Sequence, residues 1–282
     1  MASFRGTQRE LGDTLDRLYR KYNRRVHVHP DPVEYLYHYE RVEDREIAGM
    51  IASSLAYGRV AQICCSVSRV LEKMNPSPAR FLEEADHEAL RAAVSDFKHR
   101  FTTATDMAEL LIGMKEFLHH HGSFHTFFSK TMDGVGKEGT VLPSLCVFVE
   151  ELRAGSRIGK NSLLPDPRRG SACKRLNLFL RWMVRRDRVD PGGWHDISPS
   201  RLIVPLDTHM HRLCLDLGLT TRVQADMKTA LEVTEAFRRI TPGDPARFDF
   251  ALTRLGMRKE IEFLWKTDRD SCSRTDIPGA RY

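Results

Sequence analysis

Apolar side chains recur at helical spacing along almost the whole chain, and no convincing stretch alternates between apolar and polar residues as a half-buried strand does. In residues 60–74, for example, apolar residues repeat every three or four positions. Capping signals mark many helix starts, among them the Thr7-x-x-Glu10 pair, and glycines such as Gly58, Gly122 and Gly218 mark helix ends. The sequence therefore predicts an all-α fold.

The length of 282 residues allows a substantial core, built as one large domain or as two lobes. We predict an N-terminal helical extension over residues 1–43 and a helical core over 44–256, with the two lobes connected near the glycine-containing stretch 132–140. The polar tail, 257–282, is expected to be partly disordered. No run of 18 apolar residues is present, and residues 1–6 carry no apolar signal region. We therefore expect no membrane span and a cytoplasmic location.

Metal-ligand patterns are absent from the sequence. The six cysteines include no C-x-x-C pair, and most lie on apolar helical faces, where a reduced thiol acts as a small hydrophobic group. His119, His120 and His121 are adjacent in the sequence, so on a helix they point in different directions. His209 and His211 are two positions apart and point to opposed sides. We therefore predict no metal site.

A concentrated positive charge lies between Arg168 and Arg188, where eight basic residues accompany the single acid Asp187. This excess is larger than the net charge of +6 of the whole chain, whose isoelectric point is about 9.0. On the helix expected from Ser171 to about Arg186, the cations Lys174, Arg181 and Arg185 cluster opposite an apolar stripe. Such a charged face is either simply solvated or a surface that contacts phosphates.

The segment Pro205–Gly218 reads as a complete short helix with both ends marked. Asp207 is a strong N-cap residue, an apolar stripe follows it, and Gly218 supplies the left-handed residue that ends helices. A capped core helix explains most of this pattern. It does not require the order Leu206-Asp207-Thr208-His209 after an apolar run.

That order resembles the helix start of the helix-hairpin-helix DNA glycosylases, the endonuclease III-like superfamily. The segment Gly170–Leu176 is similar to the family's hairpin-then-lysine segment, although only Pro167 and Gly170 remain of the hairpin pattern. The 33 positions between Lys174 and Asp207 are closer to the spacing in the archaeal 8-oxoguanine glycosylases. Segments 44–60 and 205–220 also resemble those of an uncharacterised bacterial family, which implies no activity by itself.

The resemblance implies a two-lobed helical bundle in which Asp207 is the catalytic carboxylate and Lys174 the nucleophile. A carboxylate can stabilise the positive charge that builds on the sugar when an N-glycosidic bond breaks. A lysine amine can attack C1′ after losing its proton, and cations such as Arg175 and Arg181 would favour that loss. Some endonuclease III relatives carry an iron–sulfur loop near the C-terminus. Here only Cys272 follows the last expected helix, so we expect no cofactor.

The residues expected to contact nucleic acid fall in two places. In the family, the loop between the first two core helices holds a polar side chain that fills the space left by a flipped base. Tyr57 and Arg59 occupy that place here, and Tyr57 either stacks in the duplex or closes its helix against the core. The other predicted contacts lie in the basic segment, namely Arg168, Arg169, Gly170, Arg175, Arg181 and Arg185.

We therefore expect a monomeric DNA N-glycosylase that removes a damaged base, such as an oxidised purine, from double-stranded DNA through Lys174 and Asp207. AP-lyase activity is compatible with the lysine. Two other classes remain open: a non-catalytic helical nucleic-acid-binding protein, and an N-glycosidase that acts on RNA or on a nucleoside. Salt-dependent duplex binding without turnover would favour the first of these, and turnover of nucleosides alone would favour the second.

Overall fold

The computed structural model describes residues 7–134, 139–156 and 162–257, and in these ranges the chain is all-α, as predicted. The described residues pair only at two isolated bridges, His99 with Thr102 and Ser171 with Asp226. No helix within these ranges combines the length and apolarity needed to cross a bilayer. The elements in order are α1 (Gln8–Tyr22), η1 (Arg25–His27), η2 (Pro32–His38), α2 (Val42–Ser54), α3 (Val60–Lys73), α4 (Pro78–Glu84), α5 (His87–Ala93), α6 (Ala104–His121), α7 (Phe124–Asp133), α8 (Leu142–Ala154), η3 (Pro167–Arg169), α9 (Lys174–Val184), η4 (Pro199–Arg201), α10 (Thr208–Asp216), α11 (Met227–Ile240) and α12 (Asp249–Met257).

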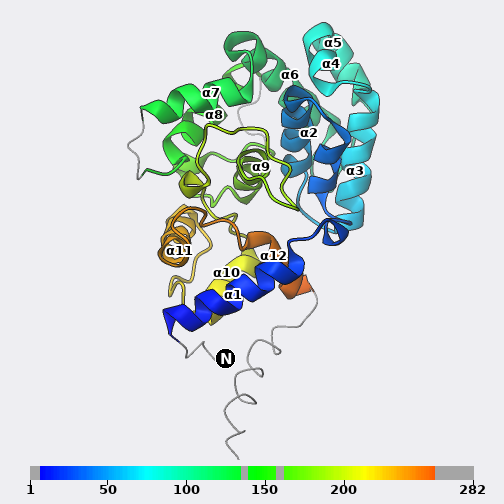
Figure 1. Ribbon diagram of the computed structural model, residues 1–282. Coiled ribbons are helices and arrows are strands. Elements are labelled where there is room, and N and C mark those ends of the chain that lie inside the picture. The colour runs from blue at the N-terminus through cyan, green and yellow to red at the C-terminus, as the bar shows by residue number, and fades with distance from the viewer. Residues whose placement is uncertain (1–6, 135–138, 157–161, 258–282) are drawn as a thin grey trace, which may run out of the picture.

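The helices form two groups with α9 between them (Figure 1). Helices α2 to α8 make up the group at the top of the view, and α1, α10, α11 and α12 make up the group below it. The first helix, α1, packs against α12 and α11, so segments from both ends of the described chain lie side by side. Residues of η2, within the predicted extension 1–43, pack against α2 and belong to the same hydrophobic core.

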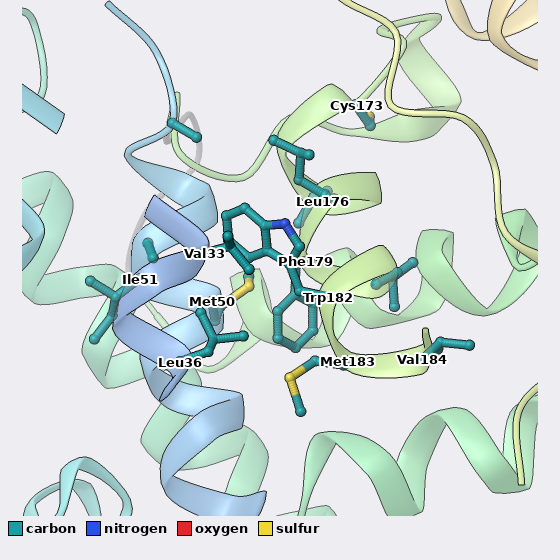
Figure 2. Close-up of a cluster of buried hydrophobic side chains, with 14 of the residues drawn as sticks. Val33, Leu36, Met50, Ile51, Cys173, Leu176, Phe179, Trp182, Met183 and Val184 are labelled. Atoms are coloured by element: carbon teal, nitrogen blue, oxygen red, sulfur yellow. The ribbon is translucent and has the colours of Figure 1, made fainter. Parts of the chain in front are cut away.

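Helix α9 is the central element of this core. Every side chain from Leu176 to Val184 is buried, and Phe179, Trp182 and Met183 are at most 1% exposed. These side chains gather with Met50 and Ile51 of α2 and with residues of η2 (Figure 2). The prediction of a helix with one face in solvent was therefore wrong for α9. From Leu176 to Val184 the helix is covered on all sides.

The capping signals place many helix starts correctly. Thr7 and Glu10 form a capping box at α1, and Ser77, Asp86 and Asp226 cap α4, α5 and α11. Gly122 and Gly218 follow their helices with φ of 81° and 70°, in the region that favours glycine.

Asp44 is of a residue type that often caps helices, but it does not cap α2, which begins at Val42. The Asp44 carboxylate instead accepts hydrogen bonds from the Ala79 backbone N–H at 3.0 Å and from the Ser77 hydroxyl, at the start of α4. The helix expected from Ser171 to about Arg186 is shorter than predicted, since α9 runs from Lys174 to Val184.

Candidate active site

The two residues predicted to carry the chemistry lie together in the structure. The Nζ atom of Lys174 is 3.7 Å from Oδ2 of Asp207, although the residues are 33 positions apart in the sequence. Lys174 is the first residue of α9, and Asp207 is the N-cap of α10. Both side chains are partly open to solvent, 29% and 37% exposed respectively, so a ligand can reach them.

The Asp207 carboxylate uses its two oxygens for different purposes. Oδ1 accepts hydrogen bonds from the backbone N–H groups of His209 and Met210, both at 2.9 Å, which confirms the predicted cap. Oδ2 faces Lys174. The cap therefore fixes the carboxyl group in space and leaves one oxygen directed at the lysine.

A residue in the left-handed conformation lies immediately before α9 and Lys174. Cys173 has φ of 47°, an unusual conformation for a residue with a Cβ atom. Its thiol is buried, which raises the pKa to about 11, and it donates to the carbonyl oxygen of Pro165. Such conformations cost about 1–3 kcal/mol and persist only where surrounding contacts enforce them. Cys173 is therefore a structural thiol at a strained helix start.

Further along the same face of α9, Arg181 and Arg185 do not reach the surface. The two residues are 2% and 3% exposed. Arg181 donates to Asp190 at 2.9 Å and also to Asp249, and Arg185 donates to Asp244, Asp187 and Asp190. The prediction that Arg181 and Arg185 contact DNA phosphates was wrong, because their charges are already neutralised inside the protein.

Arg175 is also occupied by contacts within the protein. Its guanidinium donates to the carbonyl oxygen of Ser54 at 2.7 Å and to that of Ser162, and it lies 5.1 Å from the centroid of the Tyr57 ring. Burial lowers the pKa of Arg175. Its predicted phosphate contact is contradicted by these partners. Arg175 instead joins the start of α9 to the end of α2.

Tyr57 closes helix α2 against the core, which was the structural alternative left open by the sequence. Its hydroxyl donates to the His99 carbonyl oxygen at 3.0 Å and hydrogen-bonds to Thr102. Its ring stacks on Phe101, with centroids 4.9 Å apart and planes at 23°. With hydroxyl and ring both engaged, Tyr57 is not free to enter a duplex. The neighbouring Arg59 is exposed, so its predicted role stays open.

The exposed aromatic residue in this region is Phe101, which the sequence analysis missed. Its side chain is 63% exposed, at the tip of the turn between the paired residues His99 and Thr102. Lys98, just before the turn, and Arg100, inside it, are exposed as well. An aromatic residue that directly follows two closely spaced cations, outside any periodic apolar pattern, was the signal available in the sequence.

Arg168, Arg169 and Gly170 form an exposed loop ahead of Lys174. Gly170 ends η3 with φ of 82°, and its carbonyl oxygen accepts from the Met227 N–H at 2.9 Å, which ties the loop to the start of α11. Arg168 pairs with Glu150 at 2.7 Å in a contact that is at least half exposed on both sides. Exposed pairs of this kind are weak, so these arginines remain available to an anionic ligand.

A family model described as "Protein of unknown function (DUF2400)" matches residues 31–258, a span that contains both Lys174 and Asp207. No curated protein and no solved structure matches the chain.

Proposed function

We propose that this chain, which belongs to the DUF2400 family because the match covers most of its length, is a DNA N-glycosylase. In this proposal it removes a damaged base, with an oxidised purine as the first candidate, and then cleaves the strand as an AP lyase. The observation that carries the proposal is the 3.7 Å approach of Lys174 Nζ to Asp207 Oδ2 at a solvent-accessible position. A nucleophilic amine beside a fixed carboxylate is the pair that this chemistry requires.

The proposed reaction assigns a separate task to each residue. The neutral amine of Lys174 attacks C1′ of the sugar, and the bond from C1′ to the base breaks as the new C–N bond forms. The base leaves with the bonding electrons and takes up a proton. Oδ2 of Asp207 stabilises the positive charge that develops on the sugar in the transition state. After the bound amine loses a proton, the C1′–O4′ bond breaks as a C1′=N bond forms, and O4′ takes up a proton. The product is the Schiff base from which a strand can be cleaved.

The exposed groups around the pair suit a duplex as substrate. Arg168 and Arg169 lie on the loop that leads into α9 and are available to phosphates.

A chain of contacts from Arg175, the neighbour of Lys174, through the ring of Tyr57 leads to Phe101. We propose that Phe101 stacks on a base next to the extruded nucleotide. Phe101→Ala should then weaken duplex binding by about 1–3 kcal/mol, measured by fluorescence anisotropy. Unchanged affinity would remove this part of the proposal.

The decisive experiment is borohydride trapping on duplex oligonucleotides that each carry one damaged base or an abasic site. The parent protein should form a covalent protein–DNA adduct, and Lys174→Gln should form none. Lys73→Gln serves as the control, because Lys73 is an exposed lysine at the end of α3 and should trap as the parent does.

Each other outcome contradicts the proposal in a different way. An adduct that persists in Lys174→Gln would assign the nucleophile elsewhere, with Lys160, outside the described residues, tested next. Salt-dependent duplex binding with neither adduct nor base release on any substrate would identify a non-catalytic nucleic-acid-binding protein. Release of bases from nucleosides or RNA alone would identify an N-glycosidase of another class.

A further inference from the structure

Val223 is the most exposed large apolar residue in the described part of the chain, with an exposed fraction of 89%. It lies in the loop 220–226, which joins α10 to α11. Exposure alone says little, because single apolar side chains are common on protein surfaces. What sets Val223 apart is that its loop is held by hydrogen bonds and is joined to the helices that carry Lys174 and Asp207.

Hydrogen bonds hold the loop on both sides of Val223. The hydroxyl of Thr229, a fully buried residue of α11, donates to the carbonyl oxygen of Gln224 and accepts from Nε of Arg222 at 2.8 Å. The Arg222 guanidinium also donates to the Asp226 carboxylate at 3.0 Å. The residues immediately before and after Val223 are thus fixed, and an exposed apolar side chain is presented by a braced loop.

The same loop is joined to both helices of the candidate pair. On the α10 side, Nε2 of His211 donates to the carbonyl oxygen of Arg222 at 2.8 Å. The His211 backbone N–H donates in turn to the carbonyl oxygen of Asp207, also at 2.8 Å. On the α9 side, Asp226 pairs with Ser171 in an isolated antiparallel bridge, three positions before the first residue of α9. The loop is therefore fixed relative to both members of the pair.

The charges on this surface favour an anionic partner. The bridge brings the segment 168–171 alongside the loop, and the exposed residues of 168–171 and 221–225 include two arginines and no acid. Asp166, Asp226 and Glu150, which lie near these segments, are each paired with an arginine. Cations beside an apolar tip suit nucleic acid, because the cations contact phosphates while an apolar side chain can enter a groove of the duplex.

We propose that Val223 enters a groove of duplex DNA beside the nucleotide on which Lys174 acts, while Arg168 and Arg169 contact the phosphates. The loop 220–226 then helps to hold the strand at a fixed position relative to the pair. Because the loop is already braced, little conformational freedom is lost when it binds. The identity of the partner rests on the proposed function, but the contact itself requires no chemical step.

The first test compares two exposed valines. Val26 is 77% exposed in η1 and follows two arginines in the sequence, so Val26→Asp and Val223→Asp change the charge of the protein equally. An acid facing phosphates is repelled, so Val223→Asp should weaken binding to duplex DNA with an abasic site by about tenfold or more. Val26→Asp should bind as the parent does. Fluorescence anisotropy at one salt concentration measures both. Parental affinity in Val223→Asp, or equal losses in the two variants, would overturn the proposal.

The second test detects the contact directly and adds no negative charge. Val223→Cys and Val26→Cys are modified with a photoactivatable azidophenacyl group in the full-length protein, and the parent treated in the same way measures the background from native cysteines such as the exposed Cys65. Val223→Cys should crosslink to nucleotides next to the abasic site, above that background, and Val26→Cys should not. No crosslink from position 223 above the background would overturn the proposal.

Failure of the proposed function looks different from failure of this contact. If the parent forms no borohydride adduct on any substrate, yet position 223 crosslinks to the duplex, the contact stands and the glycosylase reaction is contradicted. If the adduct forms while Val223→Asp binds as the parent does, only the contact is contradicted. A parent protein that does not bind duplex DNA at all would contradict both.

Discussion

Lys174 at the start of α9, Arg181 two turns later and Arg185 at its C-cap lie on the same face, yet these cations have opposite surroundings. Lys174 is 29% exposed and faces a carboxylate that is 37% exposed. The side chains of Arg181 and Arg185 are 3% and 4% exposed and pair with Asp190, which is fully buried. Cationic side chains at helical spacing therefore form a partly exposed pair at one end and a buried ion-pair network at the other.

Burial explains this difference. A cation removed from water must be paired, and the pair then contributes to the integrity of the fold because neither partner can be lost alone. A partly exposed pair gains little stability, so its members can exchange partners with a ligand. The start of α9 is thus suited to chemistry and its continuation is not.

The largest expected effect is on stability at the buried end. Arg181→Ala would leave Asp190 and Asp249 without one of their partners, and we expect it to lower the free energy of unfolding by about 3–5 kcal/mol. Lys174→Ala, at the exposed end of the same face, should cost less than about 1 kcal/mol. Urea unfolding followed by circular dichroism measures both. Equal losses in the two variants would refute the distinction between the two ends of α9.

The next largest effect is on activity at the exposed end. Asp207→Asn keeps the hydrogen bonds to the His209 and Met210 N–H groups, since asparagine and aspartate serve equally well as N-caps. It removes the negative charge, so base excision should fall by about 10²–10³-fold while the melting temperature and duplex affinity stay near those of the parent.

Asp207→Ala separates the two roles of this residue. Loss of the cap should lower stability by about 0.5–2 kcal/mol, in contrast to the asparagine variant. Thermal melting and single-turnover excision, measured on both variants, give the comparison. Full activity in Asp207→Asn would return the residue to a purely structural role.

The sequence predicts local features of this protein well and distant pairings poorly. The helical class, the cap at Asp207 and the left-handed residue at Gly218 depend on neighbouring residues, and the structure bears them out. That Lys174 lies beside Asp207 followed from a family resemblance, since helical spacing alone cannot bring two helices together. Helical spacing placed Arg181 and Arg185 on one face, but it could not indicate that acids from later segments cover that face.

The smallest expected effect concerns the surface cations ahead of α9. If Arg168 and Arg169 bind phosphates, each replacement by alanine should reduce the slope of log affinity against log salt by about 0.9, with a modest loss of affinity at low salt. Arg80→Ala is the matched control, because Arg80 forms a similar exposed pair with Glu84 on α4, away from the loop.

Glu150→Gln provides a test of opposite sign, since it releases Arg168 from its partner and should strengthen duplex binding. Fluorescence anisotropy titrations over a range of salt concentrations measure all four variants. Equal slopes in the parent, Arg168→Ala and Arg169→Ala would mean that the loop before α9 does not contact the DNA backbone, and that the exposed charges of this region are simply solvated.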